Sequence, residues 1–444
     1  MKPSNPLRAR RLSTFVLALT FATVSISAHA QLRLPSINWP VPERIGQLGN
    51  DLLADPVNRL GKVRELPSLR ELRLDQVNAL LRRHREVLAA DPRGEPVVRR
   101  EILAWNPGQA GLAAASSAGL TVLRQRRLDG LDETMVVLQA PEQADLAVLL
   151  QLLRSADPAG SYDYNHIYTG SGALAAGTGA AAPRPGAGNS GGSAGIGLID
   201  SGVDAGHAVF RGARIERWGC GTAHHPDPHG TAVAALMVGK SQHFQGVAPG
   251  ASLYAADIYC NSPTGGSADR IAAALAWLAG EKIGVINMSI VGPANQTLER
   301  VVGSMVRRGH LLVAAVGNDG PAAPPLYPAS YPGVVGVSAV DKRGRVIAEA
   351  ARGKQVMFAA PGNHMVSASV GEPPYRQVRG TSYAAPIVAA LLAASLARPD
   401  RDAAAAALAA LARKATRANG EAVSNETGLG VVGQGFRIDP SALR

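Results

Sequence analysis

Residues 194–204 read AGIGLIDSGVD, a near-continuous apolar run that ends in an aspartate. Runs of this kind are typical of parallel strands that helices cover on both faces of a sheet. Four more follow in the C-terminal half, namely ASLYAADIY (251–259), VINMSI (285–290), LLVAAVGN (311–318) and VVGVSAV (334–340). Segments with helical periodicity separate them, such as GTAVAALMVG (230–239), ADRIAAALAWLAG (268–280) and LERVVGSMVRRG (298–309). This alternation predicts a doubly wound, mostly parallel α/β domain.

Polar residues stand where several of these elements begin or end. In such sheets, chemistry gathers beyond the carboxyl ends of the strands. Asp200 ends the first run, and Asn318 ends another run in a glycine turn. His229 lies just before a helix in PHGTAVAALMVGK, and Ser382 begins a helix in QVRGTSYAAPIVAALLAA. Each alone has a structural interpretation, because aspartates cap turns and serines cap helices.

Together these four residues supply what acyl transfer needs. A serine hydroxyl becomes a nucleophile when a neighbouring imidazole takes its proton, and a carboxylate holds that imidazole in the right tautomer. Ser382, His229 and Asp200 would fill these three roles. The Asn318 amide and the Ser382 backbone N–H, at a helix N-terminus, would bind the oxyanion. The set predicts a hydrolase with a serine nucleophile.

These motifs resemble those of the subtilisin-like serine peptidases, the subtilase family. Three motifs follow the family's order of aspartate, histidine and serine, namely LIDSGVD around Asp200, HGTAVAALMVG around His229 and GTSYAAPIVAA around Ser382. AAVGNDGP around Asn318 resembles its oxyanion element, and INMSIVGP resembles the strand that borders its substrate cleft. The order differs from that of the α/β-hydrolases, whose nucleophile comes first. The resemblance implies a secreted serine endopeptidase that acts on protein or peptide substrates and needs no catalytic cofactor.

Three positions depart from the residues usual in this family. Ser201 stands where threonine is usual, and Val291 and Val316 stand where smaller residues are common. These changes leave the mechanism intact but bear on the size of the substrate pocket. The stretch from Asp200 to His229 is also short for the family, and the sequence does not locate the family's structural calcium sites.

Two other functions fit parts of the sequence. The loop CGTAHHPDPHG would serve a metal-dependent hydrolase if its side chains bound a metal ion, and its candidate ligands are Cys220, His224, His225, Asp227 and His229. Two prolines and a non-helical spacing disfavour a shared ion, and the triad accounts better for His229. A non-catalytic peptide-binding protein on a subtilase scaffold is the other alternative, since a fold alone does not confer function.

The N-terminus has the pattern of a secretory signal peptide over residues 1–30. A basic stretch precedes an apolar run at 15–26, and Ala28-His29-Ala30 is a small-x-small cleavage site. We therefore expect a secreted or periplasmic protein with no integral membrane segment in its mature form. Cys220 and Cys260 are expected to form a disulfide in that compartment. Each follows a segment that reads as a strand, so two neighbouring strands would bring them together.

The region before the α/β domain divides into three parts. Residues 31–95 are an Arg- and Leu-rich region with helical spacing, and residues 169–194 form a Gly/Ala/Pro-rich stretch predicted to be a flexible linker. Residues 96–168 read as strand, helix, strand, strand, helix, strand, the order of a ferredoxin-like α+β domain. The family resemblance implies that this domain is a prodomain that assists folding, inhibits the active site and is cut off autocatalytically near residues 170–190. The catalytic domain would then span 195–444.

Charge argues against a nucleic acid partner. The chain has 45 Lys and Arg against 34 Asp and Glu, and four of the basic residues lie in the predicted signal peptide. The remaining positive excess is spread along the chain, without a basic stripe interleaved with aromatic residues.

Overall fold

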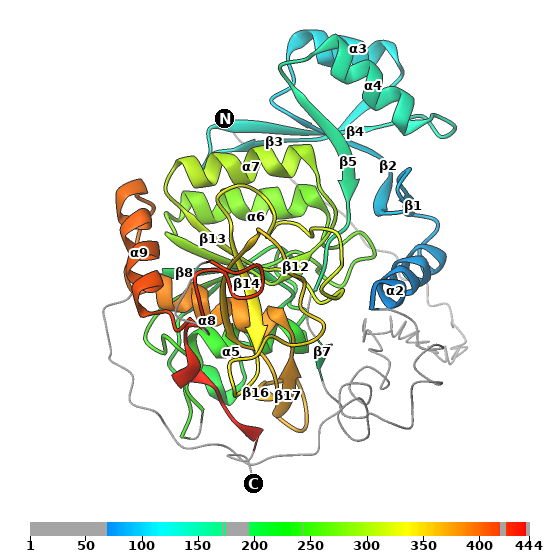
Figure 1. Cartoon of the computed structure of the whole chain (residues 1–444). Coiled ribbons are helices and arrows are strands. Elements are labelled where there is room, and N and C mark those ends of the chain that lie inside the picture. Colours follow the sequence, from blue (N-terminus) through cyan, green and yellow to red (C-terminus); the bar gives the residue numbers. More distant parts are fainter. Residues whose placement is uncertain (1–68, 171–172, 175–194, 243, 418–422, 441–444) are drawn as a thin grey trace, which may run out of the picture. The chain divides into compact units, whose positions relative to one another are not determined.

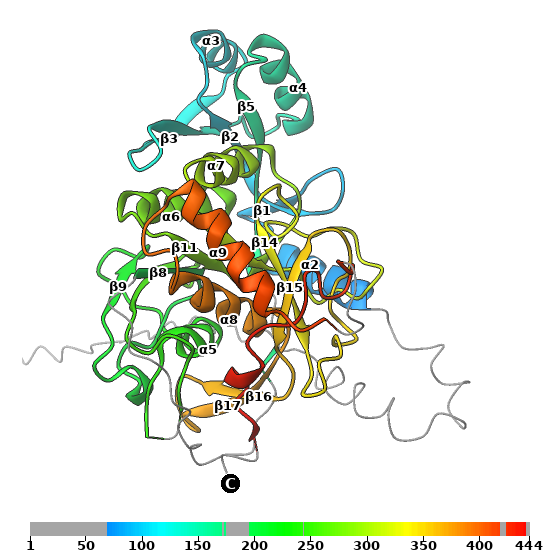
Figure 2. The ribbon, with the colours of Figure 1, turned by 60° about the vertical axis from the view of Figure 1, so that its left-hand side comes forward.

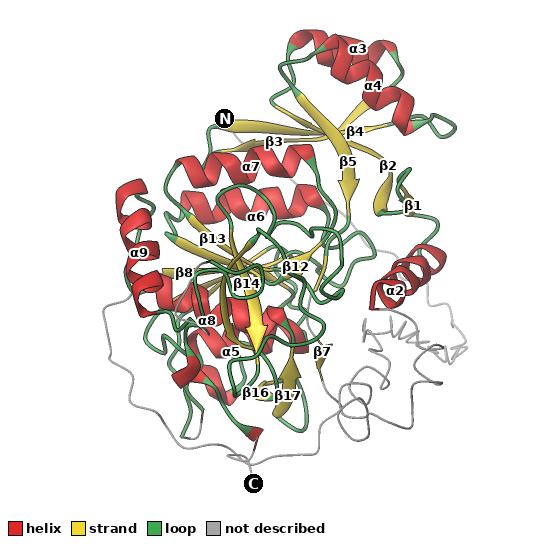
Figure 3. Cartoon of the chain, in the orientation of Figure 1, coloured by secondary structure: helices red, strands yellow, loops and turns green. Residues whose placement is uncertain are grey.

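The computed structural model describes residues 69–170, 173–174, 195–242, 244–417 and 423–440 (Figure 1, Figure 3). The predicted signal peptide lies outside these residues, as do all other residues before 69 and most of the predicted linker.

A seven-stranded sheet forms the centre of the C-terminal part. Its strand order is β15-β14-β13-β11-β8-β10-β9, and each neighbouring pair runs parallel. The strands are β8 (Gly195–Asp200), β9 (Ile215–Trp218), β10 (Ser252–Asp257), β11 (Val285–Met288), β13 (Leu311–Ala315), β14 (Val335–Val340) and β15 (Val356–Pro361). The expected doubly wound, mostly parallel α/β fold is confirmed.

Helices cover both faces of this sheet (Figure 2). One face packs against α5 (Pro228–Val238), α8 (Thr381–Ala393) and α9 (Arg401–Lys414), and the other against α6 (Ala268–Gly280) and α7 (Gln296–Arg307). In β13, Val313 belongs to the first apolar cluster, and Leu312 and Ala314 belong to the second. Because successive strand residues face opposite sides, a strand buried on both faces reads as an uninterrupted apolar run.

An antiparallel sheet lies in the N-terminal part. Its path is β1-β2-β4-β3, and β5 also pairs with β2. Its elements, with the two helices that alternate with them, are β1 (Leu88–Ala90), β2 (Pro96–Trp105), α3 (Gln109–Ser117), β3 (Thr121–Leu128), β4 (Glu133–Gln139), α4 (Leu146–Ala156) and β5 (Ser161–His166). From β2 onward, the order is the one expected from the sequence for residues 96–168.

Both faces of this second sheet are also covered. Ile102 and Ala104 of β2 belong to the apolar cluster that includes residues of α4, whereas Leu103 and Trp105 belong to the cluster that includes α6 and α7. The N-terminal sheet therefore packs directly on the helices of the larger domain.

Two local features differ from the sequence prediction. The N-terminal region that was expected to be helical does contain α2 (Leu69–Arg83). The same region also contains β1, which forms a hairpin with β2. The turn DPRG explains this, because Asp91 Oδ1 accepts hydrogen bonds from the N–H groups of Arg93 and Glu95, and Gly94 supplies a φ of 84°.

The second difference lies where the linker was expected to start. Two short strands occur there, β6 (Thr169–Gly170) and β7 (Ala173–Leu174). β6 pairs with β12 (Ile290–Val291), and β7 pairs with β17 (Tyr375–Arg379), which in turn pairs with β16 (Met365–Ala368). Hydrogen-bonding edges offered by the α/β domain thus order residues whose composition alone predicts flexibility.

Candidate active site

Asp200 lies at the carboxyl end of β8, near the middle of the parallel sheet, and is 1% exposed. Its Oδ1 accepts a hydrogen bond from His229 Nδ1 at 2.7 Å and another from the Ser201 N–H at 2.7 Å. A buried carboxylate is stable only when charged partners or hydrogen bonds replace its water. These two donors hold its oxygen toward the imidazole.

His229 lies in the first turn of α5, and two side chains fix that turn. Asp227 caps the helix, since its Oδ1 accepts from the His229 N–H at 2.8 Å. Ser201 Oγ donates to Asp227 Oδ1 at 2.8 Å and accepts from the Gly230 N–H at 3.0 Å. Ser201, which stands where threonine is usual in the family, thus links the end of β8 to the start of α5.

The electrostatic surroundings of His229 favour its protonated form. Burial alone would lower the pKa of its imidazole, but the negative charge of Asp200 and the hydrogen bond to it outweigh burial, and Asp227 adds to them. The net effect raises the pKa above the ordinary histidine value. Nε2 makes no hydrogen bond with any residue that the structure describes. The histidine therefore has one nitrogen oriented by a carboxylate and the other available as a base.

Ser382 lies in the first turn of α8 and is fully buried. Its Oγ donates to the carbonyl oxygen of Ser289 at 3.3 Å, and the Ser289 Oγ donates to the Ser382 carbonyl oxygen at 2.9 Å. The aromatic ring of Tyr383, the next residue, lies 5.6 Å from the His229 ring between centroids. The residue after Ser382 thus contacts the histidine ring, and the Ser382 hydroxyl faces the backbone between β11 and β12 (Ile290–Val291).

Asn318 and the turn before Ser382 hold each other in place. The Thr381 N–H donates to Asn318 Oδ1 at 3.1 Å, and the Gly317 N–H donates to Thr381 Oγ1 at 3.2 Å. Because an N–H only donates, the atom facing it is the amide oxygen. The Nδ2 end of the Asn318 amide is then the end left to donate to a substrate.

Residues 167–170 and 173–174 of the chain itself lie along this site. Thr169 and Gly170 pair antiparallel with Val291 and Ile290, and a Cβ placed on Gly170 would lie 3.7 Å from His229 Nε2. On the opposite side Tyr168 donates its N–H to the Gly266 carbonyl at 2.8 Å. Beyond the site, β7 pairs antiparallel with β17, directly before the turn that leads to Ser382. The segment thus follows the path of an extended peptide past the histidine.

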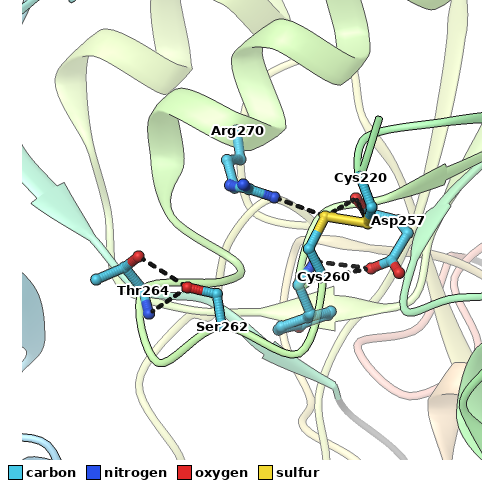
Figure 4. The surroundings of a disulfide bond; sticks show 7 residues. Cys220, Asp257, Cys260, Ser262, Thr264 and Arg270 are labelled. Atoms are coloured by element: carbon cyan, nitrogen blue, oxygen red, sulfur yellow. Dashed lines mark hydrogen bonds between the residues drawn. A yellow bond between two sulfur atoms is a disulfide. The ribbon is translucent and has the colours of Figure 1, made fainter. Parts of the chain in front are cut away.

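The two cysteines are joined by a disulfide, with Cα atoms 5.4 Å apart (Figure 4). They follow the edge strand β9 and its parallel neighbour β10, as expected from the sequence. Asp257 lies beside them, and its Oδ1 accepts from the Cys260 N–H at 2.9 Å. The bond removes the Cys220 thiolate from the proposed metal ligand set, and Asp227 and His229 of that set are engaged in the helix cap and the aspartate contact.

The two valines that depart from the family pattern occupy different places. Val291 lies on β12 opposite Thr169, so it borders the peptide path. Val316 is fully buried in the apolar cluster beneath α6 and α7. Only Val291 is therefore placed to affect peptide binding directly.

Comparison with known proteins agrees with this geometry. The model of the subtilase family matches residues 191–430. The chain belongs to the subtilase family. Its family makes it a serine-type endopeptidase.

Two curated relatives each match slightly less than half of the chain. The chain is 32% identical over 211 residues to subtilisin DY of Bacillus licheniformis, a match that covers 46% of this chain and 76% of that protein. It is 35% identical over 231 residues to subtilisin-like protease 1 of Trichophyton verrucosum, covering 48% of this chain and 56% of the relative.

A solved subtilase structure is similar over more of the chain. It is that of fervidolysin from Fervidobacterium pennivorans, described as a keratinolytic enzyme related to subtilisin. The TM-score is 0.62 at 20% identity, covering 77% of this chain and 61% of fervidolysin. At this identity the likeness supports the fold alone.

Several residues of the site were not identified from the sequence in their structural roles. Asp227 was considered only as a metal ligand, although its place directly before Pro228 at a helix start is a capping signal. Ser289 and Thr381 lay inside recognised motifs without a role of their own. The path of Tyr168 and Gly170 through the site has no local signal, because it depends on strands more than 90 residues away.

Proposed function

We propose that the chain is an exported serine endopeptidase in which Asp200, His229 and Ser382 form the catalytic triad and Asn318 binds the oxyanion. The observation that carries this proposal is the 2.7 Å contact between Asp200 Oδ1 and His229 Nδ1, with Gly170 of a peptide segment beside the His229 ring and Tyr383, the residue after Ser382, in contact with that ring. Family membership supports the reaction class.

The steps of the reaction follow from these positions. Ser382 Oγ turns from the Ser289 carbonyl, attacks the peptide carbonyl carbon and gives its proton to His229 Nε2. Asp200 stabilises the imidazolium, and the Asn318 amide with the Ser382 N–H stabilises the oxyanion. The imidazolium then protonates the leaving amine, which departs and leaves an acyl-enzyme. A water molecule that gives its proton to His229 attacks the acyl carbon, and Ser382 regains its proton as the acid leaves.

Residues before the α/β domain would act as a ferredoxin-like prodomain. Their sheet packs on α6 and α7, and their C-terminal end pairs with β12 beside His229. Gly170 ends the short strand beside His229, and Ala173 begins the short strand that pairs with β17 before the Ser382 turn. We therefore propose that self-cleavage occurs within the sequence Gly170-Ser171-Gly172-Ala173, at the early end of the range expected from the sequence.

Export rests on the signal peptide predicted for residues 1–30, which lie outside the described part of the chain. The Cys220–Cys260 disulfide supports an oxidising compartment, because such bonds are rare in the cytosol. Across the residues that the structure describes, no helix combines the length and apolarity that a bilayer crossing requires.

The decisive experiment compares wild-type protein with Ser382→Ala, both expressed in a host that lacks other exported proteases. Intact-mass measurement should show wild type cut between Gly170 and Ala173 and Ser382→Ala accumulating as a signal-cleaved precursor. A fluorophosphonate should label wild type alone. If wild type is neither cut nor labelled but still binds peptides, the chain is a peptide-binding protein. A Ser382→Ala protein cut at the same bond would show that another protease matures it.

A further inference from the structure

The turn that carries Asn318 is held by the connection between β14 and β15. The Gly320 N–H donates to the Glu349 carbonyl oxygen at 2.9 Å. On the other side of Asn318, the Ala351 N–H donates to the Gly317 carbonyl oxygen at 3.0 Å. Gly317 and Gly320 have φ values of 100° and 99°, a backbone conformation that favours glycine. A turn built on glycines has few side chains to brace it, so its position depends on these backbone hydrogen bonds.

The side chain of Glu349 joins this connection to the strand that leads to the nucleophile. Arg379, the last residue of β17, donates from Nη2 to Glu349 Oε2 at 2.7 Å and from Nε to Glu349 Oε1. Two parallel bonds between a guanidinium and a carboxylate are strong and fix the relative orientation of both groups. The side chains are 12% exposed for Glu349 and 26% exposed for Arg379, so water competes less with this pair than with a surface ion pair.

Arg379 also reaches a third segment, which follows β15. Its Nη1 donates to Asn363 Oδ1, and the N–H of the next residue, Gly380, donates to the Gly362 carbonyl oxygen at 2.8 Å. The guanidinium therefore binds two side chains from different segments directly before the turn that carries the nucleophile. Its planar fork of donors suits this arrangement, which the ammonium group of a lysine could not reproduce.

These contacts close on themselves around the two expected oxyanion donors. Thr381 binds Asn318 directly, through its N–H at 3.1 Å from Asn318 Oδ1. The ion pair of Arg379 and Glu349 reaches the same turn from the other side, because the backbone of Glu349 binds its far end. The Asn318 turn therefore cannot move relative to the Ser382 N–H without breaking at least one of these contacts.

We propose that Arg379 and Glu349 are positioning residues that hold the Asn318 amide where the oxyanion forms. The inference rests on the proposed peptidase function and deepens it. The two side chains act through Asn318, and not on the substrate. A donor that stabilises a transition state must be held in place before the charge develops, and a displacement of roughly 1 Å can cost about 100-fold in rate.

The first test is the substitution Glu349→Gln, which keeps the size of the side chain but removes its charge and turns one acceptor into a donor. Enzyme matured from the full chain is quantified by fluorophosphonate labelling and assayed on an internally quenched peptide with the sequence of residues 165–176. We expect kcat to fall roughly 10-fold with KM within about twofold of wild type, because the lost interaction matters only in the transition state. Arg379→Lys should act in the same direction and serves as a second variant if Glu349→Gln does not fold.

A matched control comes from the same connection between β14 and β15. Arg345 donates from Nη2 to Asp341 Oδ2 at 2.9 Å, and its side chain is 65% exposed. Arg345→Gln removes this ion pair in the same way, but the pair makes no contact with the Asn318 turn among the interactions that the structure describes. The control should therefore keep kcat within about twofold of wild type.

The second test asks whether the ion pair acts through Asn318. The rate of self-cleavage of the full-length precursor, followed by intact mass, is compared for Glu349→Gln with Asn318 present and with Asn318→Ala. With Asn318 present the substitution should slow self-cleavage roughly 10-fold. With Asn318→Ala it should slow self-cleavage less than about twofold, because the amide that the pair positions is gone. A contribution to the stability of the fold alone would give the same factor in both.

Three results would overturn the inference and leave the proposed peptidase standing. They are a folded Glu349→Gln or Arg379→Lys enzyme with kcat within about twofold of wild type, a rise in KM at unchanged kcat, and an equal effect of Glu349→Gln with and without Asn318. If the wild type is neither cut nor labelled by the fluorophosphonate, the proposed function and this inference fail together.

Discussion

Among the residues that the structure describes, two histidines contact buried aspartates, and the two contacts leave the histidine ring in different states. In the site, His229 Nδ1 lies 2.7 Å from Asp200 Oδ1, and Nε2 makes no hydrogen bond with any described residue. In the N-terminal part, His166 Nε2 lies 3.3 Å from Asp91 Oδ2, and its Nδ1 lies 2.9 Å from Asn295 Nδ2. The His229 imidazole therefore has one nitrogen available as a base, whereas both nitrogens of the His166 imidazole have hydrogen-bond partners.

The partner of the second nitrogen determines the tautomer of His166. Asn295 Oδ1 already accepts from the Leu298 N–H at the start of α7, so its Nδ2 is the donor to His166 Nδ1. The proton of His166 therefore lies on Nε2 and points at Asp91, whereas the proton of His229 lies on Nδ1 and points at Asp200. A carboxylate beside a histidine orients the ring in both cases. Reactivity depends on what faces the other nitrogen.

The largest expected difference between the two pairs is the effect of removing each histidine. His229→Ala should slow self-cleavage roughly 10⁶-fold, because no other group takes the Ser382 proton. His166→Ala should still be cut, because that ring lies outside the reacting groups. Intact mass followed over time measures both. A His229→Ala precursor that processes itself would remove this histidine from the mechanism.

The second-largest effect is expected when Asp200 loses its negative charge. Asp200→Asn should lower kcat roughly 10⁴-fold, because the amide no longer holds the imidazole in the right tautomer or stabilises its cation. The raised pKa of His229 means that wild-type activity is lost as pH falls through a value above the ordinary histidine pKa. In the variant this acid limb should move to lower pH. A pH profile of kcat/KM with an unmoved limb would contradict the assignment.

The oxyanion site should show a smaller effect. Asn318→Ala should reduce kcat roughly 100- to 1000-fold with KM nearly unchanged, because the amide acts on charge that develops only in the transition state. Steady-state kinetics on an internally quenched peptide with the sequence of residues 165–176, NHIYTGSGALAA, decide this. Activity within a few-fold of wild type would exclude Asn318 from oxyanion binding.

The smallest expected effect concerns the contact between Asp91 and His166, which should contribute to the stability of the fold. Burial alone would raise the Asp91 pKa, but hydrogen bonds from His166 and from the N–H groups of Glu95 and Arg93 lower it to about 2. A lowered carboxylate pKa stabilises the fold above the ordinary value of 3.8, and this contribution is lost as pH falls toward about 2.

This effect is measured by thermal unfolding of the uncut Ser382→Ala precursor with and without Asp91→Asn. The substitution should lower Tm by roughly 2–4 °C at neutral pH. The difference should shrink as pH falls from 4 to 2, the range set by the two pKa values above. A difference that is constant over this range would show that the carboxylate charge contributes nothing.

Local sequence was sufficient for the α/β fold and for nominating Asp200, His229, Asn318 and Ser382, because each stands next to a strand or helix whose pattern is readable by itself. The same holds for the cysteines, which follow two segments that read as strands. The role of Ser201 at the start of α5 was not predictable, because it depends on where Asp227 and Gly230 lie in space.

The tertiary structure alone decided how the chain passes through its own active site. Residues 169–174 carry a composition that predicts a flexible linker, yet four of them pair with β12 and β17, more than 100 residues further along the chain. Tyr168 has no unusual sequence context, and its packing against Gly292 and its hydrogen bond to the Pro293 carbonyl appear only in the folded chain. Elements form from neighbours in the sequence, whereas pockets and strand edges form from segments that folding brings together, so no local pattern records them.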